Sequence, residues 1–302
     1  MIITNTVLNG LRTAFREEFR TRMLELDAKP IWKLLATIIP SSTKSNTYGW
    51  LSAFPQMREW VGDRVIKDMA EAAYQIVNEK WESTLGVMRT DIEDDNLGQY
   101  RVIARHMADE FERFMNRHLA LLIVNGFSNL CFDGQKFFDG EHPVYPNTDG
   151  TGTATSVSNI IGNGTGKPWA LLCLSGSLKP FIVQQRTLPE FEEITDTKNE
   201  TVFMKDQYLY GIRYRGSWGY GLWQQAVGSK EALTTAKYEA ARLAMQTFKR
   251  DGGDPLGIMP THLIVDPTNE AAARAILSRE LINGGESNPN YHTAELVVVP
   301  HL

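Results

Sequence analysis

The sequence of 302 residues is poor in cysteine, and its two cysteines do not form a recognisable pair. Cys131 and Cys173 lie far apart in the chain, and neither belongs to a C-x-x-C motif. This spacing argues against a disulfide framework and against a zinc knuckle. The low cysteine content fits a reducing compartment.

The sequence also has no excess of positive charge and no long hydrophobic run. Its formal net charge is -5, whereas a surface that neutralises phosphates needs concentrated lysine and arginine. No apolar run approaches the ~20 residues that span a bilayer, and the start of the chain lacks the charged and apolar regions of a signal peptide. We therefore expect a soluble protein, made in the cytoplasm, that does not bind nucleic acid tightly.

Common catalytic motifs are missing as well. The sequence contains no G-x-S-x-G, no H-E-x-x-H, and no cysteine and histidine pairs at the spacing of a zinc site. Gly166 and Lys167 resemble the end of a phosphate-binding loop. However, Ile161 and Pro168 occupy the positions where that loop requires glycine and a hydroxyl residue. These absences argue against the corresponding classes of enzyme.

One short segment carries the strongest candidate for chemistry, because Asp133, Asp139, Glu141 and His142 fall within one predicted hairpin. Carboxylates and a histidine can bind a metal or act as acid and base. Turns also favour aspartate for backbone reasons, and no second histidine lies at a ligand spacing nearby. We expect no catalytic residue, cofactor or metal. A metal-dependent hydrolase centred on Asp133, Asp139 and His142 is the alternative.

The sequence is instead rich in long amphipathic segments. Near the N-terminus, apolar residues at steps of three or four predict one face of a helix: Leu8, Leu11, Phe15, Phe19, Met23 and Leu26. After Gly98, a longer seam predicts a helix of roughly 25 residues, about 38 Å long. Its apolar residues are Tyr100, Ile103, Met107, Phe111, Phe114, His118 and Leu121. We expect this helix to lie on a sheet, with a charged face toward water or a neighbouring chain.

The segment from Trp60 to Arg89 alternates in its second half, but neither side of the predicted strand is purely apolar. A hairpin with polar residues on both faces is poorly suited to the core of a monomer. It suits a projection that contacts other chains. A solvent-exposed hairpin without a partner fits the same pattern.

The rest of the sequence predicts strands and helices in an uneven order. Residues 169–186 and 207–228 have the composition of strands, whereas residues 187–205 are polar and predict a loop. Ser229 is expected to cap a helix, and Asp266 is expected to cap another. This mixture indicates the α+β class rather than a doubly wound sheet or a TIM barrel.

Five motifs follow one another along the chain: TKSNTYGWLSAFPQMREWVGDR, TDIEDDNLGQY, CFDGQKFFDGEHP, LKPFIVQQR and GYGLWQQAVGS. In this order they resemble the Mu-like phage major head subunits, the gpT-type major capsid proteins. The resemblance extends over nearly the whole chain, from about residue 4 to the end.

The resemblance implies an HK97-like capsid fold, in which an arm and an extended loop reach over neighbouring subunits. A spine helix and a long sheet form a peripheral domain, and an axial domain lines the symmetry axes. We expect permuted order of these domains here, because the long strands precede the last helices. The expected ranges are 1–47 for the N-terminal arm, 48–90 for the extended loop hairpin, 91–228 for the peripheral domain with spine helix 99–125 and flexible loop 147–166, and 229–302 for the axial domain.

The resemblance also implies a function and partners. We expect a major capsid protein, made in the host bacterial cytoplasm, that self-assembles as hexamers and pentamers into an icosahedral virion shell around double-stranded DNA. The resemblance further implies that a scaffold and a maturation protease assist assembly, and it implies no membrane as a partner. By residue type and position, the candidate intersubunit contacts are Trp60, Trp81, Arg101, Arg105 and Glu112. Besides the hydrolase, another virion component such as a tail subunit is an alternative.

Overall fold

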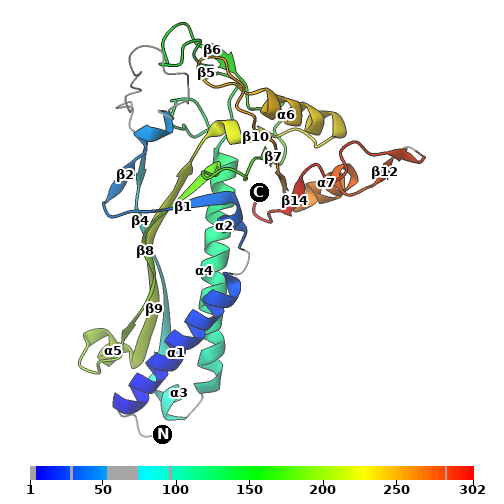
Figure 1. Ribbon diagram of the computed structural model, residues 1–302. Coiled ribbons are helices and arrows are strands. Elements are labelled where there is room, and N and C mark those ends of the chain that lie inside the picture. The colour runs from blue at the N-terminus through cyan, green and yellow to red at the C-terminus, as the bar shows by residue number, and fades with distance from the viewer. Residues whose placement is uncertain (1–4, 28–29, 53–73, 95–96, 283) are drawn as a thin grey trace.

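The computed structural model describes residues 5–27, 30–52, 74–94, 97–282 and 284–302. Two four-stranded sheets organise them (Figure 1). The long sheet has the order β1-β8-β9-β4 and consists of Ala36–Pro40, Phe181–Ile194, Gln207–Tyr220 and Glu79–Met88. The second sheet has the order β10-β7-β11-β14 and consists of Ala226–Ser229, Trp169–Leu172, His262–Val265 and Glu295–Val298.

The long sheet is built around two antiparallel strands of 14 residues each, β8 and β9. The edge strand β4 pairs antiparallel with β9, and β1 pairs parallel with β8 at the other edge. Along β9 every second side chain is buried, including Tyr208, Tyr210, Ile212 and Tyr214. This alternation is the pattern of a strand with one covered face.

The helix α4, Leu97–Asn125, covers that face and is the longest of the described helices. The prediction of a long helix after Gly98 is confirmed. Its buried stripe repeats at helical spacing through Ala104, Met107, Ala108, Phe111, Met115, Leu119 and Ile123. The helix ends where Gly126 lets the next turn come close, because a Cβ at that glycine would lie 3.0 Å from the Phe138 ring.

The N-terminal helix α1, Asn5–Leu26, lies alongside α4, as the blue and green helices of Figure 1 show. Its predicted apolar face is confirmed, since Leu8, Leu11, Phe15 and Phe19 are buried. Phe15 also reaches the sheet, with its ring 4.9 Å from that of Tyr210. The short helix α2, Ile31–Leu35, then leads directly into β1.

The second sheet is buried far more completely. All four residues of β7 and all four of β10 are buried. The helices α6, Thr235–Thr247, and α7, Glu270–Leu277, pack on this sheet. The core is continuous from the C-terminal half of α4 into this sheet, because Met115 and Ile123 belong to the same apolar cluster as Leu171 and Ile264.

Smaller elements complete the described chain. Three two-stranded pairs are β2 with β3, β5 with β6 and β12 with β13, formed by Ser45–Thr47 with Gln75–Val77, His142–Val144 with Thr155–Val157, and Leu281–Ile282 with Glu286–Ser287. The remaining helical turns are α3, α5, η1, η2 and η3, at Arg89–Glu93, Glu200–Lys205, Gly49–Ser52, Trp223–Gln225 and Pro267–Asn269.

Two local predictions are wrong. Residues 187–205 were expected to form a loop, but β8 continues to Ile194 and α5 follows. The β8–β9 register shifts between Gln185 and Thr187 and again between Thr187 and Glu190, a step that contains Pro189. Such bulges let a strand continue past a proline that cannot donate to the ladder. Ser229 does not cap a helix: it ends β10, and Thr234 caps α6 by accepting from the backbone of Lys237. The prediction that Asp266 caps a helix is confirmed.

The observed sheets do not follow the expected domain ranges. The strand β4 lies in the long sheet, although residues 48–90 were expected to form an extended loop and its approaches. Both β7 and β10 lie in the second sheet, although residues 91–228 were assigned to the peripheral domain. A boundary at residue 229 therefore does not separate the two sheets. The part of the expected hairpin around Trp60 lies outside the described residues.

Candidate assembly surfaces

Trp81 joins the edge strand β4 to the helix α4. Its half-buried ring lies 5.0 Å from the ring of Phe114, 4.7 Å from that of His118 and 5.9 Å from that of Trp218. Its Nε1 donates to the carbonyl oxygen of Gly216 at 3.3 Å. Burial lowers the pKa of His118 in this cluster. The structure thus gives Trp81 a packing role within the chain.

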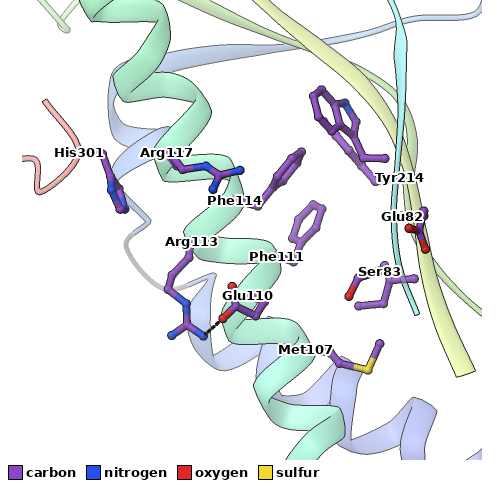
Figure 2. A pocket seen from close by; sticks show the side chains of 12 residues that line it. Glu82, Ser83, Met107, Glu110, Phe111, Arg113, Phe114, Arg117, Tyr214 and His301 are labelled. Carbon is purple, nitrogen blue, oxygen red and sulfur yellow. Dashed lines mark hydrogen bonds and ion pairs between the residues drawn. The ribbon is translucent and has the colours of Figure 1, made fainter. Parts of the chain in front are cut away.

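A groove of about 680 Å³ runs between α4 and the strands β4 and β9. Figure 2 shows Phe111 and Phe114 pointing from α4 toward Tyr214 and the strands, with Arg113 and His301 on the other side of the helix. The lining is mostly apolar and is flanked by charged residues; it comprises Trp81, Glu82, Ser83, Met107, Glu110, Phe111, Arg113, Phe114, Arg117, Ile212, Tyr214 and His301. An apolar groove with a polar rim is typical of a contact surface.

The strand β4 forms one edge of the long sheet, and in the described part of the chain it pairs only with β9. Val87 is the one buried residue among its ten. An edge strand leaves a row of backbone donors and acceptors available to another chain, and charged side chains such as those of Glu79 and Lys80 limit indiscriminate pairing. The groove and the β4 edge therefore form one continuous surface.

The charged face of α4 binds the N-terminal helix through ion pairs. Arg105 contacts Glu25 at 2.6 Å and Glu18 at 3.5 Å, and Arg22 contacts Asp109 at 2.7 Å. Hydrogen bonds from Arg22 and from Arg105 lower the pKa of Glu25. Arg105 was predicted as a candidate intersubunit contact, and in the structure its ion pairs lie within the chain.

Glu112 also contacts the N-terminal segment. Its carboxylate accepts from Trp32 Nε1 at 3.0 Å and from Asn116 Nδ2 at 2.9 Å, while Asn116 Oδ1 accepts from the backbone of Trp32 at 3.1 Å. Arg101 is exposed, and Trp60 lies outside the described residues. The charged residues of α4 indicated a face that makes contacts. The spacing of residues along the sequence could not show that the chain's own N-terminal segment makes many of those contacts.

The alternative chemical site is only partly assembled. His142 Nδ1 lies 2.7 Å from Asp133 Oδ2, and the fully buried imidazole stacks on the Trp223 ring at 4.0 Å. Burial acts to raise the pKa of Asp133, but hydrogen bonding and charge from His142 outweigh it, so the pKa is lowered. Asp139 is not in this cluster, because its carboxylate accepts from the backbone of Gly140.

Two partners of this cluster were missed from the sequence. The Sγ of Cys131 lies 3.1 Å from Asp133 Oδ1, and the Oδ1 of Asn159 lies 3.2 Å from His142 Nε2. The C-x-D spacing of Cys131 and Asp133 was a possible signal for the first. Asn159 lies 17 residues beyond His142 and carries no comparable signal.

None of the helices that the structure describes is long and apolar enough to span a membrane.

A long helix on an extended sheet, joined to a compact second sheet, defines a subunit of a phage capsid with the HK97-like fold. The structure superposes on a chain of the procapsid of bacteriophage JBD30 with a TM-score of 0.88 and 44% identity, covering 99% of this chain and 100% of that one. It matches a chain of the bacteriophage JBD30 capsid with a TM-score of 0.77 and 31% identity, covering 99% of each.

The chain belongs to the family of the Mu-like prophage major head subunit gpT, whose model matches residues 8–302. It is 41% identical to the major capsid protein of Escherichia phage Mu over 307 aligned positions, covering all of both chains. It is 39% identical to the Mu-like prophage FluMu major head subunit of Haemophilus influenzae, covering 92% of this chain and 91% of the relative.

These findings confirm the α+β capsid fold and the role of a major capsid protein in the virion shell. The family is structural, and the chain is not an enzyme. The comparisons support neither the hydrolase nor the tail subunit considered as alternatives.

Proposed function

We propose that copies of this chain form rings of five and six in an icosahedral shell, and that each subunit uses its groove and β4 edge to contact a neighbour. The full-length superposition on a procapsid chain, with a TM-score of 0.88, carries this proposal. Head-to-tail contacts between unlike surfaces close into rings when the rotation between copies permits. The apolar groove and the β4 edge, which is unpaired among the described residues, offer one such surface, and many weak contacts add up in a shell.

Among the candidate contact residues, Arg101 is exposed on α4 and available to a neighbour. Trp81 lines the groove, although its ring also packs within the chain. Arg105 and Glu112 have partners in the N-terminal segment, so any contact that they make with a neighbour requires α1 or α2 to move. Trp60 stays a candidate contact of the extended loop.

We further propose that this conformation corresponds to a precursor shell. The TM-score is higher for the procapsid chain than for the capsid chain, 0.88 against 0.77, although 99% of this chain is covered in both cases. In this conformation α1 is held against α4, and a mature shell would then involve a rearrangement of such contacts. The domain ranges expected from the resemblance need one change. We assign β4 to the domain of the long sheet, and β7 and β10 to the domain of the second sheet.

The partners of the shell are also a proposal. Family membership favours a scaffold and a maturation protease during assembly, double-stranded DNA inside, and synthesis in the host bacterial cytoplasm. One structural relative is a capsid decorated with minor capsid protein trimers, so an outer decoration is a further candidate partner. A net charge of -5 suits a container that does not adhere to its contents.

Expression of the chain with and without its phage's scaffold tests this function. Negative-stain microscopy and size-exclusion chromatography should show closed isometric particles in at least one condition. Open tubes in both conditions would contradict the proposed closed rings. A subunit that stays monomeric even with the scaffold would contradict self-assembly itself.

A further inference from the structure

Three potential metal ligands converge in the interior of the chain, away from the groove. Cys131 and Asp133 lie in the turn that follows α4, and His142 begins β5. One thiol sulfur, one carboxylate oxygen and one imidazole nitrogen lie within 4.8 Å of one another. Cys131 and His142 are buried, and the Asp133 side chain is 10% exposed.

The spacing of these atoms is close to that of a coordination sphere. The carboxylate of Asp133 lies between the other two groups, 3.1 Å from the sulfur and 2.7 Å from Nδ1. Zinc bonds of ~2.0–2.3 Å in a tetrahedron place neighbouring ligand atoms roughly 3.3–3.7 Å apart. These two separations would lengthen by about 1 Å or less to admit the ion, and the sulfur and the imidazole nitrogen lie within 4.8 Å of each other.

Asn159 fixes which nitrogen of His142 faces the cluster. The Nδ2 of Asn159 donates to the carbonyl oxygens of Phe137 at 2.8 Å and of Ala226 at 3.2 Å. Its Oδ1 is therefore an acceptor, and it lies 3.2 Å from His142 Nε2, which must carry the hydrogen. The other nitrogen, Nδ1, turns toward the thiol and the carboxylate. A histidine that binds a metal typically donates its second ring N–H to an oxygen in this way.

We propose that Cys131, Asp133 and His142 form a binding site for a divalent transition metal, with zinc as the best match. A set of one sulfur, one nitrogen and one oxygen suits zinc, whereas calcium and magnesium prefer oxygen ligands alone. Three protein ligands leave the fourth tetrahedral position to a water molecule or another donor.

The same three groups can also be held together by two protons. One proton would lie on the thiol and point to Asp133 Oδ1, and the other would lie on His142 Nδ1 and point to Oδ2. A divalent ion replaces these two protons and leaves the net charge of the cluster unchanged, so both arrangements are compatible with a buried position. The two arrangements differ in metal content, which can be measured directly.

The metal would strengthen the region where the two sheets meet (Figure 1). The His142 ring stacks on Trp223, which lies between β9 of the long sheet and β10 of the second sheet. Asn159 connects the same histidine to the backbone of Ala226 at the start of β10. The ion would tie the turn after α4 to this connection.

The test uses the full chain without a histidine tag, purified without chelators and analysed for metal by mass spectrometry. We expect close to one zinc per chain, and a loss of at least tenfold in Cys131→Ser and in His142→Gln. Cys173→Ser is the matched control, because Cys173 is also buried but its thiol pairs with the Ser175 hydroxyl and does not belong to the cluster. This control should keep its zinc.

Cobalt substitution provides a second measurement that does not depend on the variants folding. Cobalt added to the metal-free wild-type chain should give intense tetrahedral absorption bands together with a thiolate charge-transfer band in the near ultraviolet. Zinc far below one per chain, with a cobalt spectrum that lacks the thiolate band, would show a proton-held cluster and overturn the proposal. Both readouts are taken on the free subunit, so they do not depend on the proposed shell contacts.

Discussion

The two sheets of this chain differ in how much of their surface the chain itself covers. Every residue of β7 and β10 in the second sheet is buried, whereas nine of the ten residues of β4 at the edge of the long sheet are not. Both sheets have four strands, but the strands of the long sheet have 5 to 14 residues whereas those of the second sheet have four each. Two strands of the second sheet are fully buried by this chain, although its edge strand β14 has no buried residue. Among the described residues, the long sheet leaves the β4 edge and the groove open to a neighbouring molecule.

This difference separates folding from assembly. Substitutions of buried residues in the second sheet should destabilise the subunit, because they remove packing from a continuous core. Substitutions on the exposed side of the long sheet should leave a folded subunit that assembles poorly. The following variants test this separation.

The largest effect is expected from Leu171→Ala in the second sheet. Leu171 is fully buried in β7 and belongs to the main apolar cluster. Truncation of a buried leucine lowers the free energy of unfolding by ~2–5 kcal/mol, and urea denaturation of the free subunit measures it. Leu188→Ala is the matched control, because Leu188 lies in β8 of the long sheet and is 65% exposed; its cost should stay within about 0.5 kcal/mol. Similar costs at both positions would remove the distinction between the sheets.

The next effect is expected from Ser83→Trp, which fills the groove. Ser83 is an exposed residue of β4 that lines the groove, so a tryptophan there should obstruct a neighbour without disturbing the core. We expect at least a tenfold loss of shells by sedimentation. The free energy of unfolding should change by less than about 1 kcal/mol.

Thr84→Trp is the control for this variant. Thr84 is the next residue of β4 and is also exposed, but it is not among the residues that line the groove. It should yield clearly more shells than Ser83→Trp. Normal shell yield from Ser83→Trp would exclude the groove as a contact.

A smaller effect is expected from Arg105→Ala, which removes two ion pairs between α4 and α1. Partly exposed pairs contribute about 0.2–1 kcal/mol each, so α1 should loosen without unfolding the subunit. Faster hydrogen exchange in residues 5–26 would reveal this change. Arg101→Ala serves as the control, since Arg101 is exposed on the same helix and should leave that exchange unchanged.

The smallest effect is expected from acidification. The pKa of Glu25 is lowered from 4.5 by its hydrogen bonds to Arg22 and Arg105. A carboxylate with a lowered pKa in the folded state stabilises that state above the unfolded value of 4.5 and loses this contribution as the pH falls through the folded value. The protection factor of the α1 amides, which corrects for the intrinsic pH dependence of exchange, should therefore fall below that pH in the wild type. In Glu25→Gln this protection should already be lower at neutral pH, and it should respond less to acid.

The sequence was most informative where one apolar face repeats over many residues. The seams of α1 and α4 predicted both helices, and the buried residues Phe15 and Phe111 lie where the spacing placed them. Long strands with alternating or aromatic composition were also predictable. In each case the segment packs against a large surface, so its buried residues recur at a regular spacing in the sequence.

Features that depend on contacts between distant segments could not be predicted. The second half of β8 is polar and contains Pro189, so only its pairing with β9 identifies it as a strand. The partner of Arg105 is the chain's own α1, some 80 residues away in sequence. Likewise, Cys131 joins Asp133 and His142 only because β5 follows the turn after α4 closely. Spacing along the chain predicts faces of elements but not which faces meet.

Hydrogen exchange measured by mass spectrometry on the free subunit and on assembled shells tests the difference between the sheets most directly. The peptides of β7, β10 and β11 should be equally protected in both states, because the chain alone covers them. Those of β4 should be exposed in the free subunit and become at least tenfold slower in the shell. Equal protection of β4 in both states would contradict a neighbour covering this edge.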